Sequence, residues 1–308
     1  MIIFLLLVVI LCLYKIKISK NGYFDDFLER EQTNSIKGLF ILFVFLRHSL
    51  QYVAKSGYAF DSFGDYFVSI VNSIAGQFIV VMFLFYSGYG VMEAIKNKGS
   101  CYITKMPRNR ILPTLLNFDI AVLCFAIVDF LLDVPITSTQ FLLSLTGWNS
   151  IGNSNWYIFV ILVCYVITYL FINEKRILLG ITMFFVIAAI LLLSGKPEWW
   201  YNTILAYPAG IFFSKNKEKI IGLWKLRYWS ILSALTLFFC VLYPFRLDCI
   251  SLKYNLLSIL FAFIVIQLTM KIKISNNILC WLGINLFPLY IYQRIPMIIL
   301  CKKKHYTV

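Results

Sequence analysis

Long apolar runs recur along almost the whole chain, and they constrain its fold more than any other feature. The runs have roughly 16 to 20 residues, close to the roughly 20 that a helix needs to cross a hydrocarbon layer about 30 Å thick. A spanning segment must satisfy its own backbone hydrogen bonds, and continuous apolarity does not fit the alternating pattern of a barrel strand. The sequence therefore predicts an all-α, polytopic bundle of transmembrane helices.

The composition agrees with a membrane protein. Hydrophobic residues make up 61% of the chain and charged residues 14%, whereas a soluble domain has about 45–50% apolar and about 25% charged residues. We expect a single transmembrane domain over residues 1–308, with about ten spans and no soluble appendage. The predicted spans are 1–14, 36–54, 67–95, 113–133, 156–172, 177–193, 199–213, 229–244, 254–270 and 278–301.

The basic residues follow the topology of such a bundle. The net charge is +14, and with the N-terminus outside, 19 of the 28 Lys and Arg residues lie in predicted cytoplasmic stretches and 7 on the opposite face. Positive residues favour the cytoplasmic side, so we expect no nucleic-acid partner. Lys302, Lys303 and Lys304 fall outside against this rule, which suggests a misplaced last span or a further helix after it.

The cysteines give no sign of a disulfide framework or a metal site. All eight are scattered, without CxxC pairing, and most lie within apolar runs. Such spacing does not match a zinc site. We therefore expect no bound metal.

Ionisable residues inside the second predicted span are the best candidates for chemistry. Each such group costs about 2.5–3.5 kcal/mol at the bilayer centre. Lys37 lies at the cytoplasmic end of this span, with the pair Arg47 and His48 in its outer half. The eleven residues from Lys37 to His48 make close to three helical turns, so both project from nearly the same face, about 16 Å apart.

His48 can accept a proton from a hydroxyl near physiological pH, as acyl transfer to a sugar alcohol requires. The alternative is a histidine that only bonds a neighbouring helix. Arg47 beside it and Lys37 on its face weaken that alternative.

Two further segments near the cytoplasmic side carry polar candidates. Ser87 and Tyr89 lie among glycines that let a backbone or a ligand come close, although tight helix packing alone also explains the glycines. The predicted basic loop with Lys105, Arg108 and Arg110 could bind the phosphates of a nucleotide-bearing donor. Positive-inside charge is the alternative, and without other evidence it is favoured. Asp119, just inside the next span, could pair with one of these arginines or with Lys37.

On the outer side, Asn155 and Trp156 follow a Gly/Asn/Ser-rich loop, and aromatic faces with amides suit a sugar ring. Trp and Tyr also populate every membrane interface, and we assign Trp199 to such a belt. The last span embeds Tyr290, Gln293 and Arg294 between two prolines. A broken helix with a cation is more typical of a cavity wall than of a lipid-facing surface.

These segments, in this order, resemble acyltransferase family 3, bacterial integral membrane O-acyltransferases that acylate sugars of surface polysaccharides. The resemblance covers about residues 34–300. The family's opening motif is an Arg and a His separated by ten residues, and Lys37 and His48 occupy these two positions. Residues 87–89 match the family's SGY segment. Its Arg-Ile-Leu-Pro segment is met by residues 110–113, its Trp-aromatic helix start by residues 155–157, and its late LYLxH-like segment by residues 289–293. The chain departs from the family at Lys37, which replaces Arg, at Pro107, which replaces the first Arg of an RxxR pattern, and at Gln293, which replaces His.

The resemblance implies a multi-pass enzyme of the bacterial cytoplasmic membrane. Acetyl-CoA, or a related acyl-CoA, would dock from the cytoplasm on Arg108 and Arg110, with Lys105 or Arg108 taking the place of the missing arginine. In this interpretation acyl-CoA is a donor substrate, and we expect no permanently bound cofactor. His48, with Lys37, would form the catalytic pair and activate a hydroxyl of a carbohydrate acceptor from the outer face; a covalent acyl-histidine is the other route. The resemblance also leads us to expect one more helix after residue 301.

Two other functions fit parts of the sequence. A polysaccharide or lipid-linked sugar transporter or flippase would use Arg47, His48 and Arg294 along a substrate or proton path, but such proteins often show an internal duplication, and none is found here. A glycan polymerase would usually need a large external loop, and the longest one, residues 134–155, is modest.

Overall fold

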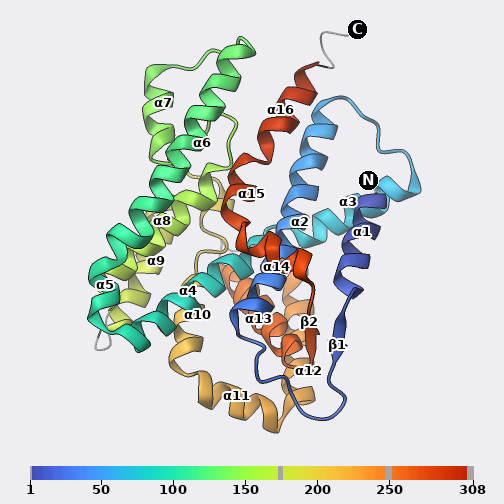
Figure 1. Cartoon of the computed structure of the whole chain (residues 1–308), viewed down its shortest axis with the longest axis vertical. Coiled ribbons are helices and arrows are strands. Elements are labelled where there is room, and N and C mark those ends of the chain that lie inside the picture. The colour runs from blue at the N-terminus through green and yellow to red at the C-terminus, as the bar shows by residue number, and fades with distance from the viewer. Residues whose placement is uncertain (1, 173–175, 247–251, 304–308) are drawn as a thin grey trace.

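The structure is a computed structural model that describes residues 2–172, 176–246 and 252–303. It is a helical bundle with one small two-stranded sheet (Figure 1). The first half contains α1 (Ile2–Leu13), β1 (Ile16–Ile18), α2 (Arg30–Lys55), α3 (Phe63–Ala75), α4 (Phe78–Lys98), α5 (Ser100–Met106), the π-helical turn η1 (Pro107–Ile111), α6 (Leu112–Leu131), α7 (Ser138–Leu145) and α8 (Asn155–Phe171). The second half contains α9 (Ile177–Leu193), the 3-10 turn η2 (Glu198–Trp200), α10 (Ala206–Lys215), α11 (Lys217–Leu226), α12 (Tyr228–Leu242), the 3-10 turn η3 (Tyr243–Phe245), α13 (Leu252–Thr269), β2 (Ile272–Ile274), α14 (Asn277–Ile284), α15 (Leu286–Tyr292) and α16 (Arg294–Lys303). The predicted all-α class is confirmed.

The number of membrane spans is lower than expected. In the described residues, five helical segments are long and apolar enough to cross a membrane, or six if the bent pair formed by α14 and α15–α16 is one span. The apolar helices α1, α8 and α9 are shorter. Each predicted span overlaps at least one helix, and α9 has the predicted bounds, but the count of ten spans is not confirmed.

Two predicted spans are interrupted. The span expected over 67–95 is divided into α3 and α4 by Gly76, whose φ of 48° favours glycine, and by Gln77. The last predicted span bends by 69° between α14 and α15–α16. Pro288 and Pro296 lie in the first turns of α15 and α16, where a proline needs no backbone N–H partner. The breaks therefore fall just before the prolines, at Asn285 and Gln293.

The predicted basic loop is helical. Lys105 lies in α5, Arg108 and Arg110 lie in η1, and α6 follows without an interruption. Pro113 does not end a loop but occupies the first turn of α6. A proline is tolerated there, because a backbone N–H in the first turn of a helix has no partner within the helix.

Two pairs of helices cross at close range through glycines. A Cβ on Gly38 of α2 would overlap the carbonyl of Leu279 in α14, and one on Gly283 would overlap the carbonyl of Asn34. In the same way, α4 and α10 approach each other at Gly88 and Gly210. Small residues allow such backbone contact between membrane helices.

The only sheet in the described residues was not predicted. β1 pairs antiparallel with β2, with Lys17 opposite Lys273, and the Lys273 ammonium bonds the Asp26 carboxylate. Both strands read Ile-Lys-Ile, and three residues are too few to establish an alternating pattern. The sheet ties the segment before α2 to the segment before α14.

Candidate functional site

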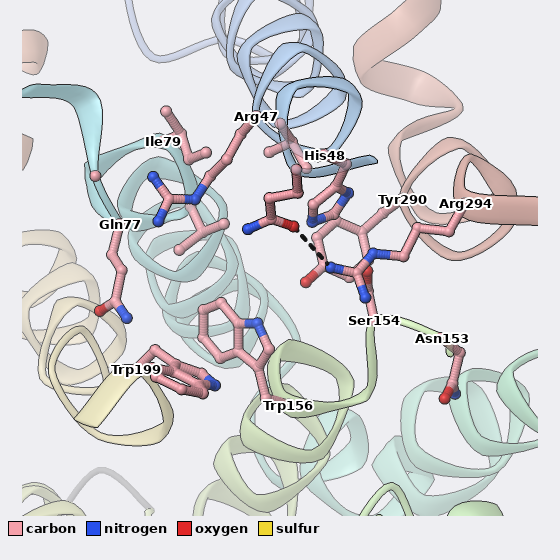
Figure 2. Close-up of a pocket in the computed structure, with 14 residues that line it drawn as sticks. Arg47, His48, Gln77, Ile79, Asn153, Ser154, Trp156, Trp199, Tyr290 and Arg294 are labelled. Atoms are coloured by element: carbon pink, nitrogen blue, oxygen red, sulfur yellow. Dashed lines mark hydrogen bonds between the residues drawn. The ribbon is translucent and has the colours of Figure 1, made fainter. Parts of the chain in front are cut away.

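A cavity of about 340 Å³ opens where α2, the break between α3 and α4, the segment before α8, and α15–α16 meet (Figure 2). Its wall combines polar and aromatic side chains from segments far apart in the sequence. These are Arg47, His48, Gln51, Gln77, Asn153, Ser154, Trp156, Trp199, Tyr290 and Arg294. The structure thus brings five of the predicted site residues, Arg47, His48, Trp156, Tyr290 and Arg294, into one cavity.

His48 is buried, with 7% of its surface exposed, and lines the cavity from α2. Its Nδ1 has no hydrogen-bond partner. The Tyr290 ring packs edge-on at 6.4 Å between centroids, and the Gln293 side chain reaches the imidazole as a hydrogen-bonding neighbour. The imidazole therefore faces a hollow rather than lipid.

Two arginines flank His48. Arg47 donates to the backbone carbonyl of Asn72 at 3.4 Å. Arg294 donates to the carbonyl of Gly152 and to Oε1 of Gln51, both at 3.3 Å. These acceptors are uncharged, so no carboxylate neutralises either guanidinium in the described part of the chain.

Aromatic rings form much of the remaining wall. Tyr290 packs against Tyr157 at 5.0 Å between centroids, and Trp156 meets Tyr157 at 6.0 Å. Trp199 lines the cavity opposite His48 (Figure 2). The assignment of Trp199 to an interface belt therefore missed its place in the cavity. Its neighbour Trp200 is fixed by Lys196, whose ammonium lies 4.4 Å from the Trp200 ring centroid and 3.7 Å from that of Trp148.

Several predicted residues lie away from the cavity lining. The Ser87 hydroxyl bonds that of Tyr165 at 3.0 Å, and Tyr89 packs against the Phe213 ring. Asn155 donates to the carbonyl of Gly147 at 2.8 Å and so holds the loop that presents Ser154 and Trp156. Asp119 forms neither of the ion pairs considered for it, and its Oδ1 has no partner.

A second polar group lies around Lys37 on the other half of α2. Arg110 is an electrostatic neighbour of the half-buried Lys37, and Tyr165 is a neighbour of Arg110. Lys105 and Arg108 are exposed beside them on α5 and η1. One of the three cations expected to bind a donor, Arg110, is therefore near the residue that opens the predicted motif.

Sequence reasoning missed Gln51, Gln77 and Ser154 as cavity residues. Gln51 lies one turn after His48 on α2, so its position was available from helical spacing. Gln77 follows Gly76 inside a long apolar run, and this pair was the signal for the break. Ser154 carried no signal of its own, because its place depends on the loop that packs against α16.

The comparison with known protein families decides the class of this protein. The sequence profile of the acyltransferase domain of acyltransferase family 3 matches residues 31–304. The chain belongs to acyltransferase family 3. It is therefore a membrane acyltransferase, and the transporter and polymerase alternatives are set aside. No curated protein and no solved structure matches the chain at a significant level. The two residues of the predicted opening motif, Lys37 and His48, both lie on the single helix α2.

Proposed function

We propose that this enzyme moves an acetyl or other acyl group from cytoplasmic acyl-CoA to a hydroxyl of an extracytoplasmic carbohydrate, in the bacterial cytoplasmic membrane. The observation that supports this most strongly is His48, a buried imidazole with an unpartnered Nδ1 in a polar cavity. Family membership supplies the reaction class, and the cavity suggests the acceptor.

His48 acts as the general base. Its free nitrogen takes the proton of the acceptor hydroxyl as that oxygen attacks the thioester carbonyl. The new C–O bond forms, the C–S bond breaks, and the imidazolium returns the proton to the departing CoA thiolate. The products are a sugar ester and free CoA, with His48 neutral again.

The cavity wall suits a sugar acceptor. Trp156 and Trp199 offer flat apolar faces for the C–H face of a sugar ring, while Gln77 and Ser154 hold unpartnered polar atoms for its hydroxyls. Aromatic rings with polar tips suit partners that have both apolar and wet faces. In the predicted orientation this cavity lies toward the outer side.

The donor arrives from the opposite end of α2. Arg110 and Lys37 lie there, with Arg108 and Lys105 exposed next to them, and arginine forks suit phosphate groups. From Arg110 a series of neighbouring tyrosines, Tyr165, Tyr157 and Tyr290, leads to His48. We assign the acyl-thioester arm to this path.

The test is to reconstitute the protein in liposomes with labelled acetyl-CoA on one side and a glycan acceptor on the other. We expect label in the glycan with wild type, and a loss of about 10²–10⁴-fold in rate for His48→Ala, the usual contribution of a general base. Thr182→Ala is the control, because Thr182 is an exposed residue of α9 that lies outside the cavity lining and donates to the carbonyl of Leu179 in its own helix. Undiminished transfer by His48→Ala would exclude the base, and transfer only when donor and acceptor share one side would exclude the transmembrane route.

A further inference from the structure

The part of the cavity lining that the structure describes is cationic. Arg47 and Arg294 line it, and the described lining residues include no Asp or Glu. The acceptors of both guanidiniums are two backbone carbonyls and one amide oxygen, at 3.3 to 3.4 Å. Such long bonds to neutral oxygens are weaker than the charge-assisted bonds an anion makes, at about 2.7–2.9 Å.

Placing two cations in helices of a membrane bundle without a carboxylate partner is costly. Ionisable residues inside membrane segments usually face the bundle interior and mark a substrate path. Both belong to helices that contribute to the bundle core, and both face the hollow beside the proposed base (Figure 2). A ligand with negative charge would offset this cost.

Unpartnered polar atoms concentrate at the same place. In the described part of the chain, five buried side-chain atoms without a hydrogen-bond partner belong to this lining: His48 Nδ1, Gln77 Oε1, Asn153 Nδ2, Ser154 Oγ and Arg294 Nε. Buried polar groups normally find partners, so this concentration indicates a polar ligand. Arg294 Nε is itself a buried cationic donor.

The polar groups are arranged on two sides of His48. Arg294 and Ser154 lie on one side, and Arg47 and Gln77 on the other (Figure 2). Oε1 of Gln77 can only accept a hydrogen bond, as from a ligand hydroxyl, whereas Arg294 Nε can only donate. An acceptor with both hydroxyls and an anionic group satisfies the two sides together.

We propose that the acceptor is an acidic sugar unit, with a carboxylate or phosphate held by Arg294 and Arg47 while a hydroxyl of the same unit faces His48. This inference rests on the proposed role of the cavity as the acceptor site. It narrows the acceptor from carbohydrates in general to anionic ones.

The experiment uses the full chain in nanodiscs and three probes: methyl β-glucoside, methyl β-glucuronide and methyl glucoside 6-phosphate. Binding is followed without acyl-CoA through the fluorescence of Trp156 and Trp199, which line the cavity. We expect one of the anionic probes to bind about tenfold or more tightly than the neutral glucoside, as buried charge complementarity allows. Preference for the glucuronide identifies a carboxylate, and preference for the phosphate ester identifies a phosphoryl group.

Substitutions of the two arginines then test where the anionic group of the probe binds. Arg294→Gln and Arg47→Gln should lower the ratio of affinity for the anionic probe to affinity for the neutral glucoside, and Arg294→Lys should retain part of that ratio. Equal binding of all three probes by wild type would overturn the inference, and this comparison does not depend on a variant folding. Transfer assays with the same probes separate the two proposals: anion preference without transfer refutes the proposed function alone, and transfer without anion preference refutes this inference alone.

Discussion

The rings of His48 and Tyr290 meet edge to face, with 6.4 Å between their centroids and 61° between their planes. Tyr290 in turn lies 5.0 Å from the Tyr157 ring, and all three residues are buried. The imidazole is thus positioned by a ring on α15 that is itself held from α8. Geometry at the proposed base depends on contacts between three helices.

We expect the Tyr290 ring, rather than its hydroxyl, to position His48. Tyr290→Ala should lower kcat by about 10²-fold through misplacement of the base and lower stability by about 3 kcal/mol through the cavity it leaves. Tyr290→Phe should retain kcat within about threefold, since it keeps the ring and its contacts. Steady-state kinetics and thermal unfolding in detergent measure both. An equal loss of kcat in the two variants would assign the role to the hydroxyl.

Gly88 and Gly90 should respond differently to the same substitution. A Cβ on Gly88 would overlap the carbonyl of Tyr207, so Gly88→Ala should cost about 1–3 kcal/mol of stability. Nothing lies within 4 Å of a Cβ on Gly90, so Gly90→Ala should be neutral or stabilising, by up to about 1 kcal/mol from helix propensity. Unfolding midpoints of the two variants in mixed micelles test this. Equal midpoints would argue against the close crossing of α4 and α10.

Arg110 should affect the donor and not the acceptor. We expect Arg110→Gln to raise KM for acetyl-CoA about tenfold with little change in kcat, the loss of one charge-assisted phosphate contact. Lys98→Gln is the matched control, because Lys98 is an exposed cation at the end of α4 outside the Lys37 group. The difference in KM between wild type and Arg110→Gln should become smaller as the salt concentration rises, since screening weakens exposed charge pairs. An unchanged KM would remove Arg110 from the donor site.

The ion pair between Lys273 and Asp26 predicts a pH dependence of stability. The hydrogen bond that the Lys273 ammonium donates to the Asp26 carboxylate raises the pKa of Lys273 above its ordinary value. Because the raised pKa belongs to the folded state, the stabilisation is complete below the unfolded pKa of about 10.4 and is lost as pH rises through the folded pKa. The unfolding midpoint of wild type should therefore fall more steeply above about pH 10.4 than that of Lys273→Gln. Parallel curves for the two proteins would contradict this assignment.

The sequence identified the features that depend on local composition. Apolar runs predict where helices lie. Arg47, His48 and Arg294 are ionisable residues within such runs, and they are predicted to line a cavity because facing lipid would be costly. Helical spacing also places Lys37 and His48 on one helix, as observed.

The sequence could not predict features that depend on tertiary contacts. Ser154 and Trp199 reach the cavity because their loops pack against distant helices, and neither residue differs in type from its many interface counterparts. The pairing of β1 with β2 joins residues about 256 positions apart, beyond the reach of any local pattern. The π-helical turn around Arg108 and Arg110 was likewise hidden, since prolines on both sides resemble loop punctuation.

The interlocked glycines of α2 and α14 have a consequence for how substrates enter. The two backbones touch at Gly38 and Gly283, so α2 cannot slide or turn unless α14 moves with it. The helix α14 leads directly into α15–α16, which contains Arg294. That half of the reaction chamber is preassembled before either reactant arrives. Admission and release then depend on the opposite wall, which includes residues 76–77 at the break between α3 and α4 and Trp199 in the turn η2.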